Sequence, residues 1–291
     1  MRIRGRYITD RGSRVLLLVS ASLSFVVLLG IAVFTLKESL PALQQIGLLD
    51  FLFGTEWRPS DEKFGVLSMI VGSLAVTAGA LLLAIPLGVG CAILLAEVAP
   101  HRVRQLLRPA VELLVGIPSV VYGLVGMVLI VPLVRQIGGP GFSVAAGIIV
   151  LTAMILPTIV SISEDSIRAV PKSHKEGALA LGATHWQTIW RVLLPASRSG
   201  IAASIVLGMG RAIGEAMAMI MVMGNAVRIP TSPLDPARTL AGGIAVEVNY
   251  AAGLHQSALF AIAVVLFLMI IVINSIALVL MKRGGRAQNL C

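Results

Sequence analysis

Six long runs of apolar residues, separated by short polar segments, dominate the chain. A hydrocarbon core of roughly 30 Å requires about 20 apolar residues in a helix, and each run meets that length. The overall composition agrees, because 57% of the 291 residues are hydrophobic and only 13% are charged, far from the balance of a soluble domain. The pattern predicts an all-α membrane protein with six transmembrane helices near residues 15–36, 66–96, 110–134, 143–163, 198–223 and 256–281.

The first apolar run follows five arginines, as the apolar core of a signal peptide follows its basic start. It is longer than the core of a typical cleaved signal, and no small-x-small cleavage site follows it. We therefore expect a retained helix. The predicted organisation is a basic N-terminus (1–14), a first transmembrane helix (15–36), a periplasmic segment (37–64), a five-helix core (65–281) and a cytoplasmic tail (282–291).

Lysine and arginine are unevenly distributed between the two sides of such a protein. The formal net charge is +9. If the N-terminus is inside, the inner segments carry sixteen basic residues and the outer segments six, and Arg211 in the fifth run completes the 23. Basic residues concentrate on cytoplasmic segments, so both termini are expected in the cytoplasm. The positive charge then reflects topology, and a nucleic-acid partner is not expected.

The segment between the fourth and fifth runs (164–197) contains signals for two short helices. Ser173 with Glu176 fits a capping box, and Gly182 is a natural helix stop. Thr184 with Gln187 fits a second capping box, which opens a helix that Pro195 should end. A helix pair of this kind is compatible with a connector, a docking element or a DNA-binding module, but the second helix is too apolar to read a groove well.

This loop resembles the EAA loop of ABC-importer permeases, which is Glu-Ala-Ala, three residues, Gly, nine residues and Ile-x-Leu-Pro. The matching residues are Glu176, Gly177, Ala178, Gly182, Val192, Leu194 and Pro195. Gly177 departs from the pattern and should weaken its helix by about 1 kcal/mol relative to alanine. The resemblance implies that Glu176, Gly177, Ala178 and Gly182 belong to a loop that couples the permease to an ATP-binding subunit.

The chain contains no Gly-x4-Gly-Lys-Ser/Thr stretch, the loop that holds nucleotide phosphates. We therefore expect a transport subunit and not an enzyme, with ATP hydrolysis in a partner. The four histidines show no metal-ligand spacing and are interpreted as surface polar residues. No metal or cofactor is predicted.

Three further stretches resemble the PstC-type permeases of bacterial phosphate importers. They are FGVLSMIVGSLAVT (64–77), ELLVGIPSVVYG (112–123) and GRAIGEAMA (210–218). The resemblance implies the six-helix fold of type I importers in the bacterial inner membrane and inorganic phosphate as the cargo. It also implies a PstA-like second permease subunit, a PstB-like ATP-binding dimer and a periplasmic PstS-like phosphate-binding protein.

Other transport functions stay open at this point. The sister PstA-type subunit shares a stretch like RAIGE, and a sulfate or molybdate permease would share the EAA loop. A secondary transporter would need no ATPase, although no strong internal repeat supports one. A membrane-bound DNA-binding regulator would retain nucleic acid through residues 168–198 in a strongly salt-dependent way.

Two charges inside the fifth run, Arg211 and Glu215, are the candidate substrate-pathway residues. An arginine at mid-membrane is disfavoured by roughly 2.5 to more than 10 kcal/mol, so Arg211 should face the bundle or a wet path. Guanidinium matches phosphate oxygens as a planar fork. On a continuous helix Glu215 lies on the face of Arg211, and Gly210 with Gly214 should admit a close helix. The pair is either a competing counter-charge for a passing anion or a structural ion pair.

Two other polar residues lie in or near the third run. Glu112 is expected at the inner mouth of this run, solvated from the cytoplasm, and no transport role is assigned to it. Tyr122 lies two to three turns deeper on a continuous helix and is a second residue that could line a path.

Overall fold

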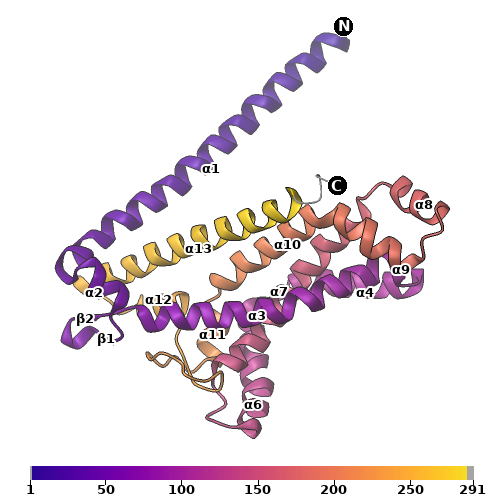
Figure 1. The fold of residues 1–291 in the computed structure, drawn as a ribbon. Helices are drawn as coiled ribbons and strands as arrows, with labels where there is room; N and C mark the ends of the chain where they lie inside the picture. The colour runs from indigo at the N-terminus through magenta and orange to yellow at the C-terminus, as the bar shows by residue number, and fades with distance from the viewer. Residues whose placement is uncertain (1, 287–291) are drawn as a thin grey trace.

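The computed structural model describes the backbone of residues 2–286 and the side chains of residues 14–279, and helices make up most of it (Figure 1). The basic segments expected at 1–14 and 282–291 lie almost entirely outside the described side chains. In chain order the elements are α1 (Arg2–Ile46), α2 (Leu48–Phe53), β1 (Trp57–Arg58), the 3-10 turn η1 (Pro59–Asp61), β2 (Lys63–Phe64), α3 (Leu67–Ile93), the π-turn η2 (Leu94–Val98), α4 (His101–Val115), α5 (Ser119–Val125), the π-turn η3 (Gly126–Ile130), α6 (Val131–Ile137), α7 (Val144–Arg168), α8 (Lys172–Ala180), α9 (His185–Thr188), the π-turn η4 (Ile189–Leu193), α10 (Leu194–Ile213), α11 (Met217–Val222), α12 (Leu240–Glu247) and α13 (Leu254–Arg286).

Six helical stretches are long and apolar enough to cross a membrane, which confirms the predicted number within the described residues. They are Arg14–Ile46, Leu67–Val98, Ser119–Ile137, Val144–Arg168, His185–Ile213 and Leu254–Val279.

The first, third and fifth spans have boundaries that differ from the predicted ones, and the fifth covers His185–Ile213 and not 198–223. The first helix continues past residue 36 to Ile46, so the segment expected outside the membrane at 37–64 begins within a helix. This extension is buried on one side, at Ser39 and Ala42. The third span, predicted over 110–134, begins at Ser119 instead. The residue before a proline is disfavoured in a helix, and Pro118 accordingly separates the exposed helix α4 from the span.

Two helices continue across a proline because the turn before it is widened. The amide of Val131 bonds five residues back to Gly126, and the amide of Leu194 bonds five residues back to Ile189. A proline ring clashes with the carbonyl four residues earlier in a regular α-helix, and a π-turn relieves that clash. The prediction that Pro195 ends the second loop helix is therefore wrong, since α9, η4 and α10 form one continuous helical stretch.

The centre of the bundle is the packing of α3 against α7. A Cβ atom added to Gly79 would lie 2.3 Å from Ile148, and one added to Gly88 would lie 2.7 Å from Ile159. Such close approach needs glycine on α3, and it fixes the two helices to each other. The main apolar cluster surrounds this contact and includes Met154 and Met219.

The first helix contacts the bundle mainly through α13 and diverges from it toward its N-terminal end (Figure 1). The apolar side chains along it are exposed. In a membrane this surface faces lipid or another subunit.

The bundle has two ends, which we call the hairpin end and the loop end. At the hairpin end, β1 and β2 pair antiparallel with Trp57 opposite Phe64, and these two rings pack in an apolar cluster with residues of α12 and α13. At the loop end lie α8 and α9, beside a small cluster that includes Ile93, Ile167 and Ile189. The spans α3 and α7 connect the two ends.

Candidate functional site

Arg211 and Glu215 lie on opposite sides of an interruption in the fifth span. Arg211 is in the last turn of α10, which ends at Ile213, and Glu215 precedes α11. Both side chains are half-buried. The prediction that the two residues share one helical face is wrong, because the backbone is not helical between them. Among the described side chains, they do not form an ion pair within 4 Å.

The interruption has a local cause in Gly214 and Glu215. The last amides of α10 make long hydrogen bonds, 3.4 Å from Gly214 N to Gly210 O and 3.4 Å from Glu215 N to Ala212 O. The Glu215 carboxylate instead accepts a hydrogen bond of 3.1 Å from the amide of Ala218. A carboxylate at the start of a helix satisfies a free amide and favours the positive end of the backbone dipoles. Glu215 thus stabilises the first turn of α11.

The start of α5 packs beside this interruption. A Cβ atom added to Gly123 would lie 2.9 Å from the Cα atom of Ala218 and 2.8 Å from the sulfur of Met221. The hydroxyl of the neighbouring Tyr122 donates to the carbonyl of Leu114 at 3.0 Å. We call Arg211, Glu215 and Tyr122 the Arg211 site.

The space beside Arg211 is open within the described chain. The sequence predicts that Gly210 and Gly214 would let another helix approach closely, and no helix of the described residues occupies that face. A Cβ atom added to Gly210 would have no neighbour within 4 Å, and one added to Gly214 would approach only the backbone of its own helix. The face of α10 that carries Gly210, next to Arg211 in the chain, is therefore open to another subunit.

The loop between α7 and α10 forms a helix pair, as predicted. Gly182 adopts φ +83° at the turn, a left-handed conformation that glycine accepts without strain. Thr184 and Gln187 form the predicted capping box, with bonds of 3.2 Å and 2.9 Å. The other predicted box is wrong: α8 begins at Lys172 after Pro171, and no side chain caps it.

The predicted coupling residues lie on the outside of this pair. Glu176, Gly177 and Gly182 are exposed and Ala178 is half-buried. Large apolar side chains are exposed beside them, with Leu181 91% exposed and Trp186 58% exposed. Apolar groups of this size on a polar end of the molecule are typical of a contact surface for another protein.

A buried charged cluster at the hairpin end was not predicted. The carboxylate of Glu247 accepts a hydrogen bond from the indole of Trp57 at 2.8 Å and from the guanidinium of Arg238 at 2.5 Å. The ring of His255 lies 2.8 Å from the same carboxylate and is largely buried. The interpretation of His255 as a surface residue is therefore wrong. The cluster joins the hairpin, α12 and α13.

Ion pairs of Glu164 form a second unpredicted cluster at the loop end. This buried carboxylate lies 2.5 Å from Arg168 and 3.9 Å from Arg108. Arg108 also contacts the exposed Glu112 at 3.1 Å. Glu112 thus lies at the solvated end of the bundle, as the sequence suggests, within α4 and before the third span.

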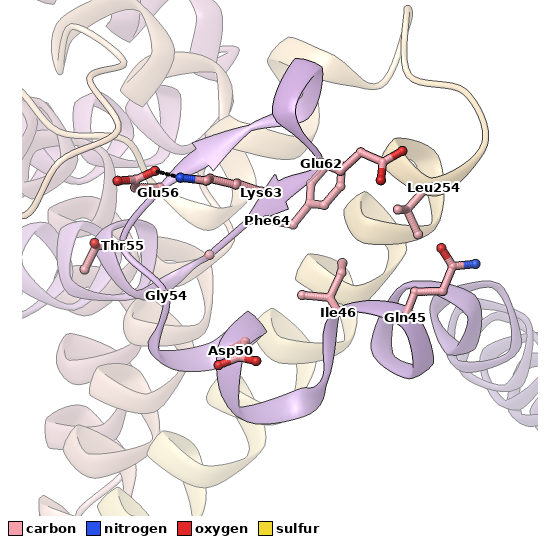
Figure 2. Close-up of a pocket in the computed structure, with 11 residues that line it drawn as sticks. Gln45, Ile46, Asp50, Gly54, Thr55, Glu56, Glu62, Lys63, Phe64 and Leu254 are labelled. Atoms are coloured by element: carbon pink, nitrogen blue, oxygen red, sulfur yellow. Dashed lines mark hydrogen bonds and ion pairs between the residues drawn. The ribbon is translucent and has the colours of Figure 1, made fainter.

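A pocket of about 610 Å³ opens at the hairpin end, between the end of α1, α2, the hairpin and the start of α13 (Figure 2). Lys63 and Glu56 point toward each other in it, 2.9 Å apart, and the hydrogen bond from Lys63 holds the pKa of Glu56 below its usual value. None of its lining residues belongs to α10 or α11. The pocket is separate from the Arg211 site.

The six spans and the exposed helix pair form a fold that solved ABC importers share. Solved permease structures have the same fold. A bacterial alginate ABC transporter matches with a TM-score of 0.63 at 18% identity, over 90% of this chain and 95% of that chain. The MetNI methionine ABC transporter matches with a TM-score of 0.54 at 21% identity, over 74% of this chain and 92% of that chain.

The chain belongs to the family of binding-protein-dependent transport system inner membrane components, which matches residues 84–284. It is 43% identical over 273 residues to the probable ABC transporter permease protein YqgH of Bacillus subtilis, covering 92% of this chain and 86% of that protein. It is 38% identical over 286 residues to the phosphate transport system permease protein PstC of Mesorhizobium japonicum, covering 91% of this chain and 87% of that protein. PstC of Pasteurella multocida is 37% identical over 254 residues, covering 80% of this chain and 79% of that protein.

These relatives confirm the predicted family, and they are permeases and not enzymes. A permease of this class works with an ATP-hydrolysing subunit and with a binding protein. The chain is accordingly a multi-pass membrane protein.

Proposed function

We propose that this chain is the PstC-type permease subunit of an importer that moves inorganic phosphate across the bacterial inner membrane. Relatives named PstC are 37% and 38% identical over most of the chain. The same resemblance supports a PstA-like second permease, a PstB-like ATPase dimer and a PstS-like phosphate-binding protein as partners. The exposed surface of α1 and the open side of Gly210 and Gly214 leave room for the second permease.

The proposal assigns the loop end to the cytoplasm and the hairpin end to the periplasm. Most lysines and arginines of the connecting segments fall in segments at the loop end, and basic residues favour the cytoplasmic side. The exposed pair α8 and α9 then faces the ATPase, and the hairpin faces the binding protein. Both termini are cytoplasmic in this orientation.

The observation that carries the phosphate assignment is the state of Arg211. It lies in the last turn of α10, near the end of a candidate span, and no described carboxylate forms an ion pair with it within 4 Å. A charge within an apolar span is disfavoured unless water or a counter-ion reaches it. Guanidinium stays protonated at any physiological pH and bonds two oxygens of an oxyanion at once. Arg211 is therefore placed to bind phosphate on its way through the subunit.

Glu215 has a different role in this proposal from the simple counter-charge that a continuous helix suggests. Its carboxylate is held by the amide of Ala218, so Arg211 is available for an anion. Because the backbone between the two residues is not helical, a modest change of its torsion angles brings the carboxylate toward Arg211. An approaching carboxylate competes with phosphate, which favours release.

The residues Glu176, Gly177, Ala178 and Gly182 form the proposed coupling surface. They lie on α8 and at its turn, next to the exposed side chains of Leu181 and Trp186. An apolar surface that includes a tryptophan is typical of the centre of a protein interface. We place the ATPase subunit on this surface.

Uptake by the reconstituted complex tests the proposal. Wild-type complex in proteoliposomes, supplied with the phosphate-binding protein and ATP, is expected to accumulate phosphate and not sulfate or molybdate. Arg211→Gln should abolish uptake while the complex assembles in normal amount. Arg211→Lys keeps the charge without the planar fork and should retain only a small part of the uptake rate.

Normal phosphate uptake by Arg211→Gln would overturn the proposed role of Arg211, and uptake of sulfate alone would overturn the assignment of phosphate as the cargo. If the chain forms a complex only with a PstC-like permease and not with a PstA-like one, it is itself the PstA-type subunit.

A further inference from the structure

Glu97 connects both helices of the exposed loop to a membrane span. It lies in the π-turn η2 at the loop end of α3, with its side chain 11% exposed. Its carboxylate oxygen Oε2 accepts a hydrogen bond of 2.5 Å from Lys175 of α8. The same oxygen lies 3.7 Å from Nε2 of His185, the first residue of α9. Among the described residues, the ion pairs between this helix pair and the spans all converge on this one carboxylate.

The end of α3 that carries Glu97 is itself held firmly. Arg104 of α4 donates to the carbonyls of Leu95 and Ala96 at 2.7 Å and 2.9 Å. Arg168 of α7 donates to the carbonyl of Leu95 at 3.3 Å. Cations near the end of a helix satisfy its free carbonyls. The turn that presents Glu97 is therefore fixed by α4 and α7.

The α8 helix has little other attachment to the spans. It buries no residue, and a Cβ atom added to Gly177 on it would meet no atom within 4 Å. A helix without buried apolar side chains is positioned by its chain connections and by whatever polar links it makes. The Lys175 contact with Glu97 is the polar link that α8 makes to a span within the described side chains.

We propose that Glu97 is a positioning residue that transmits movement of the α8–α9 pair to α3. This inference rests on the proposed function, in which an ATP-hydrolysing partner moves that pair. A displacement of α8 and α9 pulls on one carboxylate at the end of α3. Because α3 packs on α7 through Gly79 and Gly88, the two spans move together. Without the link, the partner moves the helix pair and α10, which is continuous with α9, while α3 lags behind.

The coupling ratio, ATP hydrolysed per phosphate moved, tests this inference in the complete complex. Glu97→Gln is expected to raise this ratio several-fold while the complex assembles in normal amount. Glu97→Asp keeps the charge, so its ratio should lie between those of the wild type and Glu97→Gln. Loss of folding alone would lower hydrolysis and transport together and leave the ratio unchanged. Glu112→Gln is the matched control, because it breaks an exposed ion pair at the same end without touching α8 or α9. An unchanged ratio in Glu97→Gln would overturn the inference, whereas absence of phosphate uptake by the wild type would overturn the proposed function.

A second measurement does not depend on the cargo. In hydrogen exchange on the purified chain, amides of residues 172–188 should exchange several-fold faster in Glu97→Gln than in Glu112→Gln. The reversed pair Glu97→Lys with Lys175→Glu should restore slow exchange, and Glu97→Lys alone should not. Equal exchange in Glu97→Gln and the wild type would show that Glu97 does not hold the helix pair.

Discussion

Arg211 lies in the last turn of α10 and Glu215 in the non-helical segment before α11, so the two charges of the fifth run do not share a helix. Each has its own function in this arrangement. Glu215 caps α11 through the amide of Ala218, and in the proposed function Arg211 binds the anion. A continuous helix would instead have placed the two charges on one face, four residues apart.

Replacing Glu215 separates its two roles. In Glu215→Gln the amide oxygen still accepts the Ala218 bond, but the negative charge is lost. We expect phosphate to bind more tightly and to leave more slowly, so half-maximal uptake occurs at a lower phosphate concentration and the maximal rate falls. Uptake kinetics in proteoliposomes measure both quantities. An unchanged half-maximal concentration would argue against a competing charge.

Glu215→Ala removes the cap as well as the charge. Loss of a helix cap destabilises a protein by about 0.5–2 kcal/mol, so this variant should unfold at a lower temperature than Glu215→Gln. Thermal unfolding of the two variants in the same detergent compares them directly. Equal unfolding temperatures would mean that the Ala218 bond does not stabilise α11.

Gly123 allows α5 to approach α11 closely, and alanine should not fit there. An added Cβ atom would lie 2.9 Å from the Cα atom of Ala218, and the backbone must shift to accept it. Overpacking of this kind destabilises by about 1–3 kcal/mol, and here it also displaces the start of α11. Gly123→Ala should lower both the unfolding temperature and uptake.

Gly90→Ala is the matched control for this prediction. Gly90 is also a helical glycine, and a Cβ atom there would have no neighbour within 4 Å. Alanine is favoured over glycine inside a helix by about 1 kcal/mol, so this variant should be as stable as the wild type or slightly more stable. A Gly123→Ala chain as stable as Gly90→Ala would contradict the close packing of α5 and α11.

The sequence predicts the elements that depend on local patterns. The six spans follow from apolar runs of sufficient length, and the capping box of Thr184 and Gln187 follows from spacing alone. The Ser173 box fails because Pro171 takes the N-cap position of α8, two residues before Ser173. The break at Gly214 is not visible either, since methionine and alanine on both sides are good helix formers.

The contacts between distant segments are outside the reach of local patterns. Glu97 and Lys175 are 78 residues apart, and Trp57 and Glu247 are 190 residues apart. Neither pair has a spacing that marks it, and the three-dimensional packing of α3, α7 and α12 brings each pair together. Arg211 was identifiable because a charge in an apolar run is unusual in itself.

Glu247→Gln should destabilise the hairpin end strongly. The buried carboxylate neutralises Arg238 and accepts the Trp57 bond, and removing one partner of a buried ion pair costs about 3–5 kcal/mol. Thermal unfolding in detergent should show a large decrease. Asp61→Asn is the control, because Asp61 contacts Arg58 at 3.9 Å on an exposed surface and should have little effect. Equal unfolding temperatures for the two variants would exclude a stabilising role of the Glu247 cluster.

Acid should loosen the turn that Asp235 holds. Its carboxylate accepts bonds from the hydroxyl and amide of Thr231 and the amide of Ser232, and these bonds, led by the hydroxyl, lower its pKa below the usual value. Because the pKa of Asp235 is lowered in the folded protein, its stabilisation of the turn is complete above the ordinary aspartate pKa of about 3.9. This stabilisation is lost as the pH falls through the lower pKa of the folded state.

A spin label at Pro233→Cys, with the native cysteines replaced, should keep constant mobility from pH 7 to about pH 4 and become mobile below it. Asp235→Asn should give a mobile label throughout, because it loses the charge that strengthens these bonds. A label that is equally immobile in Asp235→Asn would contradict this account, since the turn would then be held by other contacts.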